Sequence, residues 1–529
     1  MMDRRQMIAA MSEPTETWDV IVIGGGATGL SAALDAAARG HRTVLVEAGD
    51  FASGTSSRST KLIHGGVRYL RQGRIRMVQQ SLAERGYLLQ NAPHLVHPVH
   101  FVLPAYQRLE QWYYLAGLKL YDFLAGQSEF EPARRLSVSE TLSCLPTIRS
   151  DGLRGGIEFS DGQFDDSRLA VSLAMTAADY GAVLANYVPV IRLIHERSRL
   201  KGVVVRDLHT GQEISLRGKV VLNATGVFAD SVLQMDDDPT HARSQPKDGI
   251  VVASQGSHLV LDPVVLPGRH AMMIPHTDDG RVLFAIPWHD RVLFGTTDLA
   301  VPEVTRDPQP MNREIDYLLE HASRYFRRPV TREHVRGMYA GLRPLVRPAG
   351  SNRSTAGMSR EHEILVSDSG MITVIGGKWT TCRAMGEELI DRAENIGELP
   401  KQASSTRTLK LSGHPDYRPP RGAQNVSSHS PQSSFPEGFP ETAPLHPRLN
   451  STYRDVRIAV QQEMAQTTED VLARRTRSLL LDAQAASECC EQVTGWIGRL
   501  LEKDSEWCHQ QVREFRELCS SSIPSVSDS

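Results

Sequence analysis

A glycine-rich turn between a short apolar run and a helical segment constrains the fold of this chain more than any other feature. Residues 19–23 (DVIVI) are a β-branched run typical of a strand buried on both faces. Residues 24–29 (GGGATG) follow with GxGxxG spacing, and a helix is predicted over about 30–39. Residues 42–47 (RTVLVE) form a second predicted strand. Together these segments predict a βαβ unit of the kind that binds dinucleotides.

Each glycine of the turn has a separate physical purpose in such a site. Gly24 permits the tight turn, Gly26 lets a pyrophosphate approach the backbone, and Gly29 lets the helix pack closely on the strand. N–H groups at the helix N-terminus would receive the phosphates. Glu47 ends the second strand and would accept hydrogen bonds from the adenosine ribose hydroxyls. The predicted cofactor contacts of this unit are Gly24, Gly25, Gly26, Ala27, Thr28, Gly29, Glu47 and Ala48.

The segments beyond this unit favour FAD over NAD. Residues 51–66 (FASGTSSRSTKLIHGG) contain no second regular βα unit, and their hydroxyl and backbone donors suit the second half of an elongated cofactor. Residues 220–226, 294–298 and 374–378 are strand ends that carry glycine or small polar residues. The predicted FAD contacts here are Thr55, Ser56, Ser57, Lys61, Leu62, His64, Ala224, Thr225, Gly226, Gly377, Lys378 and Thr380.

Changes in composition divide the 529 residues into five parts. We expect a flexible N-terminal tail (1–17), an FAD-binding domain interleaved with a substrate domain (18–402), a disordered Ser/Pro-rich linker (403–446), a helical C-terminal domain (447–522) and a tail (523–529). Helical stretches alternate with short strands before residue 402. The predicted class is α/β, a Rossmann-like core with a mixed or antiparallel second sheet and a small all-α cap. In the cap, Thr467 is predicted to begin a capping box.

Charge and cysteine content exclude several classes of protein. The formal net charge is −3, so no global positive field exists to bind nucleic acid. No apolar run reaches the roughly 18 residues that a membrane span needs. The six cysteines form no CxxC pattern, which favours a reducing compartment, and the first residues do not resemble a signal peptide. These features predict a cytoplasmic enzyme or a soluble binding protein.

Eight short motifs, in order along the chain, resemble the FAD-dependent glycerol-3-phosphate dehydrogenase family. They are IVIGGGATG, TSSRSTKLIHGGVRYL, APHLVHP, NATG, GSHLV, FGTTD, GLRPL and GGKWTT. The resemblance runs from about Trp18 to about Glu398 and resumes in DVRIAVQQEMAQTTEDVLARRTR, which is similar to the family's helical cap. It implies oxidation of sn-glycerol 3-phosphate to dihydroxyacetone phosphate by hydride transfer to the flavin N5. The stretch 403–446 departs from the family pattern, which has the folded start of the cap there.

Arginines beside glycine or proline are the candidates for binding the substrate phosphate, because the guanidinium fork binds phosphate bidentately. Arg343 lies in GLRP, where proline fixes the following backbone, and the resemblance puts it at the substrate side of the flavin with a catalytic role. By resemblance Arg68 and Tyr69 line the same pocket. Arg360 is a weaker phosphate candidate, and Lys378 would contact the phosphate or stabilise the reduced flavin. A purely structural role is the alternative for each.

A histidine is the preferred general base, because its ordinary pKa near 6.5 suits proton abstraction near neutrality. His258 in GSH resembles a family pocket residue, and His64 lies in the segment expected to wrap the flavin. We rank His258 slightly above His64; hydrogen bonding to backbone is the alternative for both. No group of residues has metal-ligand spacing in the sequence, and no metal is predicted.

The electron acceptor follows only from the resemblance, which implies a membrane quinone or, in a related oxidase branch, O₂. Residues 68–76 carry four arginines and residues 109–124 carry five aromatic residues, a combination typical of interfacial helices. A core or dimer helix explains these residues equally well. The expectations are a homodimer in the cytoplasm, peripheral on the inner face of the cell membrane. The alternatives are an O₂-using glycerol-3-phosphate oxidase, an amine or amino-acid oxidase relative, or a flavin-binding regulatory module without turnover.

Overall fold

The βαβ unit lies at the centre of a sheet that is mainly parallel. In the computed structural model, β1 (Trp18–Ile23) pairs in parallel with β2 (Thr43–Val46) on one side and with β10 (Glu213–Asn223) on the other. The connecting helix α2 (Ala27–Ala38) begins three residues before its predicted start, because the end of the glycine motif forms its first turn. The structure describes residues 2–13, 17–71, 73–107, 109–126, 130–236, 249–347, 361–420 and 441–524, without the side chains of Arg68 and Arg71.

This first sheet has the strand order β17-β18-β10-β1-β2-β7, and a hairpin extends β10. The further strands are β17 (Glu363–Val366), β18 (Ile372–Ile375), β7 (Val183–Ala185) and the hairpin β8 (Val190–Glu196) and β9 (Arg199–Arg206). The helices packed around it are α7 (Asp166–Asp179), α8 (Ala229–Asp236) and α10 (Cys382–Ile396). Leu30 of α2, Leu173 of α7 and Leu389 of α10 share one buried apolar core with β1. This burial fixes the start of α2 against the end of β1.

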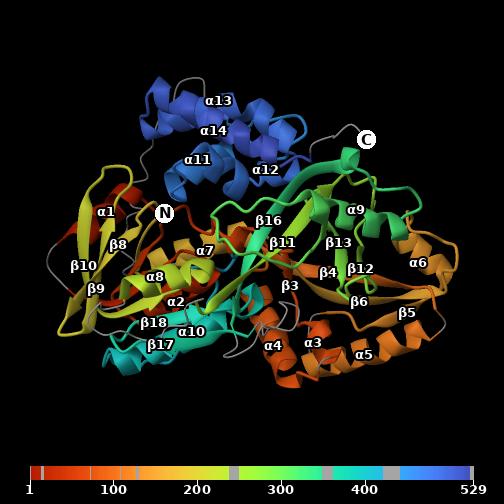
Figure 1. Cartoon of the computed structure of the whole chain (residues 1–529), viewed down its shortest axis with the longest axis horizontal. Helices are drawn as coiled ribbons and strands as arrows, with labels where there is room; N and C mark the ends of the chain where they lie inside the picture. Colours follow the sequence, from red (N-terminus) through yellow and green to blue (C-terminus); the bar gives the residue numbers. More distant parts are fainter. Residues whose placement is uncertain are drawn as a thin grey trace.

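A second sheet, largely antiparallel, packs beside the first (Figure 1). Its strands are β3 (Leu62–Ile63), β4 (Val96–Ala105), β5 (Arg134–Leu136), β6 (Gly155–Phe164), β11 (Val251–Leu261), β12 (Ala271–Ile274), β13 (Leu283–Trp288), β14 (Arg291–Gly295), β15 (Leu299–Ala300) and β16 (Val335–Val346). Its helices are α3 (Val67–Arg71), α4 (Ile75–Asn91), α5 (Glu110–Ala125), α6 (Val138–Cys144) and α9 (Asn312–Tyr325). The predicted class, an α/β core with an interleaved second sheet and a helical C-terminal domain, is confirmed.

The C-terminal helices form a layer along one side of the molecule, blue in Figure 1. They are α11 (Tyr453–Gln462), a π-helical turn (Asp470–Arg475), α12 (Ser478–Leu481), α13 (Ala483–Leu501) and α14 (Ser505–Ser521). The predicted capping box is present, since Thr467 Oγ1 accepts from the Asp470 N–H at 3.1 Å and Asp470 Oδ2 accepts from the Thr467 N–H at 3.1 Å. No helix among the described residues is both long and apolar enough to cross a bilayer.

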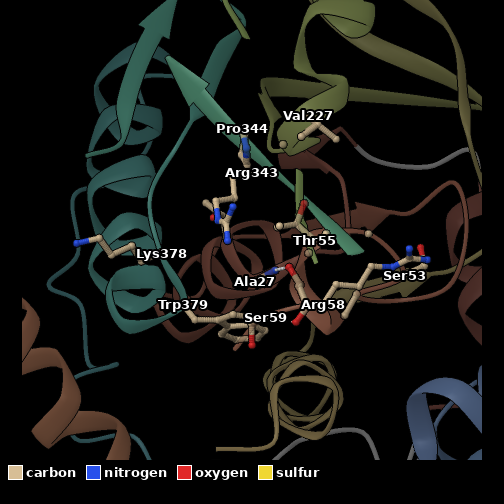
Figure 2. Close-up of a pocket in the computed structure, with 18 of the residues that line it drawn as sticks. Ala27, Ser53, Thr55, Arg58, Ser59, Val227, Arg343, Pro344, Lys378 and Trp379 are labelled. Carbon is tan, nitrogen blue, oxygen red and sulfur yellow. Dashed lines mark hydrogen bonds between the residues drawn. The ribbon is translucent and has the colours of Figure 1, made fainter. Parts of the chain in front are cut away.

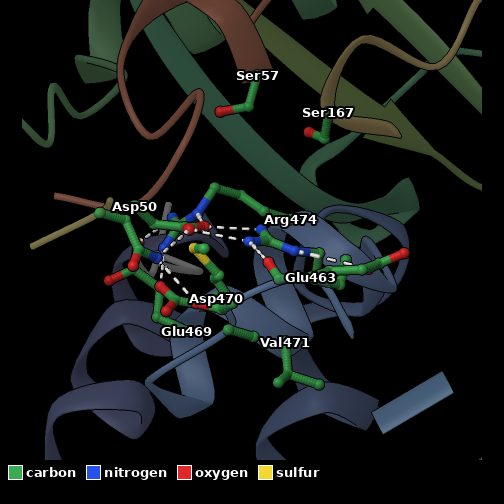
Figure 3. Close-up of polar contacts among 12 residues, drawn as sticks. Asp50, Ser57, Ser167, Glu463, Glu469, Asp470, Val471 and Arg474 are labelled. Carbon is green, nitrogen blue, oxygen red and sulfur yellow. Dashed lines mark hydrogen bonds and ion pairs between the residues drawn. The ribbon is translucent and has the colours of Figure 1, made fainter. Parts of the chain in front are cut away.

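A buried cluster of charges joins this C-terminal domain to the body (Figure 3). Asp50, just after β2, accepts from Arg474 Nε at 2.7 Å and from two nitrogens of Arg475 at 2.7 and 2.9 Å. Arg474 also donates to Asp470 at 2.5 Å. Burial alone would raise the pKa of Asp50, but Arg475 and Arg474 outweigh it and lower that pKa to about 2. Asp50 therefore stays ionised and paired near neutrality.

Two expectations about the chain's organisation are wrong. Residues expected as a flexible tail include helix α1 (Arg4–Ser12), because Met11 is buried against β1 and Arg4 pairs with Asp207 at 2.5 Å. Residues 403–420 and 441–446, expected as disordered linker, hold buried Leu409, Leu411 and Leu445, so their few apolar side chains are enough to attach them. The rest of that stretch, 421–440, lies outside the described residues.

Candidate active site

A cavity of about 1230 Å³ lies where the carboxyl ends of the parallel strands face the second sheet. Figure 2 shows Ala27 at the start of α2 and Arg343 on β16 among the residues that line it. Most of the residues predicted from the sequence line this one cavity. They are Gly24, Gly26, Ala27, Thr28, Glu47, Ala48, Thr55, Ser56, Leu62, His64, Tyr69, Ala224, Thr225, Gly226, His258, Arg343, Gly377, Lys378 and Thr380. The fold thus brings together segments as far apart in the sequence as Gly24 and Thr380.

The glycine turn is shaped to receive an anionic group. Gly24 has a φ of +107°, and a Cβ there would lie 2.7 Å from the carbonyl oxygen of Ala224. A Cβ on Gly29 would lie 1.9 Å from the Gly24 carbonyl oxygen, so helix and turn touch as predicted. Gly26 and Ala27 at the start of α2 line the cavity, and the Ala27 N–H donates to Ser56 Oγ at 2.9 Å, so the helix N-terminus faces the cavity with its first N–H paired. This arrangement fits a pyrophosphate.

Glu47 lies at the adenosine end that the motif predicts. Its carboxylate accepts from the Gly25 N–H at 2.6 Å and from the Gly49 N–H at 2.8 Å, one hydrogen bond on each oxygen. Burial raises its pKa, while these two backbone donors oppose the rise. Each carboxylate oxygen retains a second lone pair, so Glu47 can hold the glycine turn and accept a ribose hydroxyl as well.

Four of the predicted cofactor residues do not line the cavity, and two predicted substrate residues are not located. Gly25 and Gly29 act through backbone contacts, and Ser57 is buried beside Gly54. Lys61 turns inward at a φ of +59° and pairs with buried Asp166 at 2.7 Å, so its side chain points away from the cavity in which FAD is expected. Arg360 and the side chain of Arg68 lie outside the described part of the chain.

At the far end of the cavity, Arg343 lies across the backbone of β11. A Cβ on Gly256 would lie 2.2 Å from Arg343 Nη2, so only glycine leaves room for this guanidinium. Arg343 Nη1 donates to the Thr297 carbonyl at 3.1 Å and Nη2 donates to Thr296 Oγ1 at 3.1 Å. Asp298 Oδ1 lies 3.9 Å from the same guanidinium. These contacts fix the fork in one orientation at the cavity wall.

His258 lies on β11 beside Arg343 and is 2% exposed. Its ring stacks on Tyr339 with centroids 4.8 Å apart, and Thr60 Oγ1 lies 2.9 Å from its Nε2. Burial, together with the positive charges of Arg343 and Lys61, lowers its pKa well below 6.5. His258 Nδ1 is buried and has no hydrogen-bond partner among the described residues.

His64, Tyr69 and Lys378 also line the cavity. Lys378 Nζ lies 3.9 Å from the centre of the Tyr69 ring and 3.4 Å from Met77 Sδ. A Cβ on Gly66 would lie 2.5 Å from the Tyr69 ring, so this glycine lets the ring close over the turn. The two candidate bases, His64 and His258, therefore both face the cavity, but only His258 is enclosed beside Arg343.

Sequence reasoning missed several residues of this site. Thr297 and Asp298 belong to the FGTTD motif, which indicated a polar strand end without assigning a partner. Glu314, on α9, accepts from Thr297 Oγ1 at 2.5 Å and from Gln255 Nε2 at 2.6 Å. Nothing in the local sequence of α9 indicates this contact. Arg58 also lines the cavity, and its position inside the predicted wrapping segment was the available signal.

Comparisons with known proteins agree with this geometry. The family described as FAD dependent oxidoreductase matches residues 19–392, and the C-terminal domain of alpha-glycerophosphate oxidase matches residues 421–508. A structure titled glycerol-3-phosphate dehydrogenase from Bacillus halodurans complexed with FAD is 27% identical, with a TM-score of 0.76 over 99% of both chains. The fold and the site define an FAD-dependent oxidoreductase, and the prediction of FAD is confirmed.

Curated relatives narrow the class further. The mitochondrial glycerol-3-phosphate dehydrogenase of Rattus norvegicus is 38% identical over 95% of this chain and 72% of its own length. The enzyme of the same name from Saccharomyces cerevisiae is 34% identical over 97% of this chain and 91% of its own length. The chain belongs to the FAD-dependent glycerol-3-phosphate dehydrogenase family, as the sequence motifs indicated.

The predicted location is wrong. We expected a cytoplasmic protein at the inner face of the cell membrane, but the relatives from rat, human, yeast and Caenorhabditis elegans are all named as mitochondrial proteins. These names favour a mitochondrial location. Low cysteine content and the absence of a CxxC pattern, on which the expectation rested, indicate a redox environment rather than an organelle.

Proposed function

We propose that this enzyme oxidises the secondary hydroxyl of sn-glycerol 3-phosphate to the ketone of dihydroxyacetone phosphate. The observation that carries the proposal is the enclosure of one cationic fork, Arg343, beside one neutral imidazole, His258, in the cavity that holds the glycine turn. A phosphate monoester needs the first group, and removal of a hydroxyl proton needs the second. The relatives' names agree with this substrate.

Different residues bind the substrate phosphate and accept the hydroxyl proton. Arg343 binds the phosphate, because its guanidinium is already oriented by Thr297 and Thr296 and loses little freedom when the substrate arrives. Lys378, which also lines the cavity, adds positive charge. His258 accepts the hydroxyl proton, since its lowered pKa keeps the ring neutral near pH 7. When bound, the flavin supplies the hydride acceptor, N5.

Anaerobic mixing of the FAD-loaded protein with glycerol 3-phosphate tests this function, with glycerol as the control. We expect the flavin absorbance to bleach with the phosphate ester and to stay unchanged with glycerol. Equal bleaching by glycerol would contradict phosphate recognition. Bleaching by an amino acid and not by glycerol 3-phosphate would show that the enzyme is an amino-acid oxidase.

We further propose a membrane quinone as the electron acceptor, because an exposed aromatic face lies directly outside the cavity wall. On α5, Trp112 and Tyr113 are 57% and 60% exposed and Phe123 is 80% exposed. The opposite side of the same helix carries buried Tyr121, whose hydroxyl accepts from the Gly65 N–H at 2.7 Å in the loop that lines the cavity.

Two basic residues lie next to the aromatic face of α5. Arg74 and Arg76 are exposed at the start of α4, and α4 packs against α5. An apolar face next to cations suits the headgroup region of an anionic bilayer. The rival acceptor, O₂, is distinguished by peroxide release: wild-type enzyme that turns over in air without a quinone, and releases stoichiometric peroxide, would contradict the quinone proposal.

A further inference from the structure

Three side chains of metal-ligating type meet on the second sheet, away from the residues that line the cavity. Cys144 ends α6, Glu158 lies on β6, and His270 precedes β12. The thiol sulfur, a carboxylate oxygen and an imidazole nitrogen all lie within 4.8 Å of one another. Their separation in the sequence, 112 residues between Glu158 and His270, explains why ligand spacing gave no signal. Only the fold brings them together.

The two oxygens of Glu158 have different partners. Oε1 lies 3.2 Å from His270 Nε2, while Oε2 pairs with Arg134 Nη2 at 2.7 Å. A carboxylate that binds a metal through one oxygen commonly keeps a hydrogen-bonded partner on the other, and that partner orients it. Arg134 is 54% exposed at its side chain, so solvent screens its charge from a cation bound at Oε1.

We propose that Cys144, Glu158 and His270 bind a Zn²⁺ ion. Tetrahedral zinc places neighbouring sulfur, nitrogen and oxygen ligands roughly 3.3–3.6 Å apart, so the three atoms, which lie within 4.8 Å of one another, need to close by at most about 1.5 Å. A thiolate and an imidazole select zinc over magnesium and calcium, which prefer oxygen ligands. A water molecule completes the coordination. The proposal is independent of the substrate assigned above.

The cysteine would bind the metal as a thiolate. Burial and the neighbouring Glu158 carboxylate raise the pKa of the Cys144 thiol, so a bound metal must displace its proton. Formation of the zinc–sulfur bond releases that proton to solvent, and no oxidant or reductant is required.

The position of the cluster connects it to the cavity wall. Successive side chains of a strand point to opposite faces, so Glu158 lies behind Phe159. Phe159 and Phe101 line the flavin cavity and stack with centroids 5.2 Å apart. A bound ion would tie α6 and the loop before β12 to the strand that forms this wall. We infer that zinc stiffens the wall and stabilises the substrate domain.

Cobalt substitution in the full-length, FAD-loaded protein tests the site, because thiolate–Co²⁺ coordination has its own absorption bands. With Co²⁺ as the probe we expect one equivalent to bind, with a thiolate charge-transfer band in the near ultraviolet that Zn²⁺ removes. Cys144→Ser should abolish the band, and His270→Gln should weaken binding at least tenfold. Cys508→Ser, a half-buried cysteine outside the cluster, is the matched control and should leave the band unchanged.

Two results would overturn the proposal. One is the lack of a cobalt–thiolate band in the wild-type protein, and the other is a band that persists in Cys144→Ser. If Cys144→Ser does not fold, His270→Gln with the exposed-histidine control His276→Gln decides the question by zinc stoichiometry after dialysis. The melting temperature gives an independent measure, since Zn²⁺ should raise it for the wild type and not for either cluster variant.

Discussion

Glu314 Oε1 accepts a hydrogen bond of 2.5 Å from Thr297 Oγ1, and the Thr297 carbonyl accepts in turn from Arg343. Glu314 is 4% exposed and lies on α9, outside the cavity lining. It therefore acts on the substrate indirectly, through Thr297 and through Gln255, which donates to its other oxygen. A buried acceptor in this place fixes the backbone oxygen that orients the phosphate-binding fork.

Removing this support should weaken substrate binding without removing the flavin. For Glu314→Ala we expect a KM for glycerol 3-phosphate about tenfold higher, equivalent to about 1.4 kcal/mol, with kcat reduced less than threefold. Steady-state kinetics and flavin content measure both effects. Glu320→Ala, at an exposed position of the same helix, is the control and should leave KM unchanged. A loss of kcat at unchanged KM would show that Glu314 does not act through Arg343.

Arg343 itself should be indispensable for reduction of the flavin by substrate. Arg343→Ala removes both the charge and the bidentate geometry, so we expect full FAD content and a reduction rate lower by about 10³-fold or more. Stopped-flow absorbance under anaerobic conditions measures the rate. Arg328→Ala, an exposed arginine away from the cavity, should match the wild type. A rate within tenfold of wild type in Arg343→Ala would refute the assignment.

The lowered pKa of His258 predicts the pH dependence of the chemical step. His258 must be neutral to accept a proton, and burial with Arg343 and Lys61 lowers its pKa well below 6.5. The rate of flavin reduction should therefore stay constant as the pH falls through 6.5 and decline only in more acidic solution. His258→Asn should lower the rate by about 10²–10⁴-fold. His64→Asn is the comparison: if it is the more damaging change, the base is His64.

Local sequence patterns predicted the glycine turn and its flanking strand and helix. The directions of other side chains at the site depend on contacts with residues far away in the sequence. The strand, glycine turn and helix at 18–38 follow from neighbouring residues, so their geometry was readable from the sequence. Lys61 lay in a segment that does contact the cavity, yet its positive φ turns it toward Asp166. The residues around Lys61 in the sequence do not predict its positive φ, so the direction of its side chain could not be predicted either.

Contacts between the domains also could not be predicted from the sequence. Asp50 and Arg475 are 425 positions apart, and each is one of many charged residues in its segment. The N-terminal helix was missed for a related reason: it is short and weakly amphipathic, and its stability comes from packing against the body and from Met2 pairing with Glu463. Tertiary burial, rather than local propensity, forms both features.

The pairing of Asp50 with Arg474 and Arg475 should support the joint between the domains. Asp50→Asn removes the carboxylate charge that two buried guanidinium groups share. Breaking a buried ion pair in this way lowers the free energy of unfolding by about 3–5 kcal/mol. Urea unfolding should show this loss, whereas Glu502→Gln, which removes an exposed ion pair with Arg5, should change stability by less than about 1 kcal/mol. An Asp50→Asn protein as stable as the control would contradict the role.

The same pairing predicts acid sensitivity of a defined kind. The folded-state pKa of Asp50 is lowered from 3.8 to about 2, so its stabilisation is complete above pH 3.8 and is lost as the pH falls toward 2. The difference in unfolding free energy between wild type and Asp50→Asn should accordingly be constant from neutral pH down to about pH 3.8 and should shrink below that pH. A difference that already shrinks near pH 6 would assign the effect to another group.

The aromatic face of α5 should bind anionic lipid bilayers. Replacing Trp112 and Phe123 together with glutamate puts charge in the apolar region, so we expect at least a tenfold loss of binding to phosphatidylglycerol-containing vesicles, measured by sedimentation. Flavin reduction by glycerol 3-phosphate should be unchanged, because neither side chain lines the cavity, while turnover with a vesicle-embedded quinone should fall in parallel with binding. Val264→Glu, an exposed apolar residue elsewhere, is the control. If the double variant binds vesicles normally but changes from dimer to monomer, the face joins two copies of the chain, and quinone must reach the flavin by another surface.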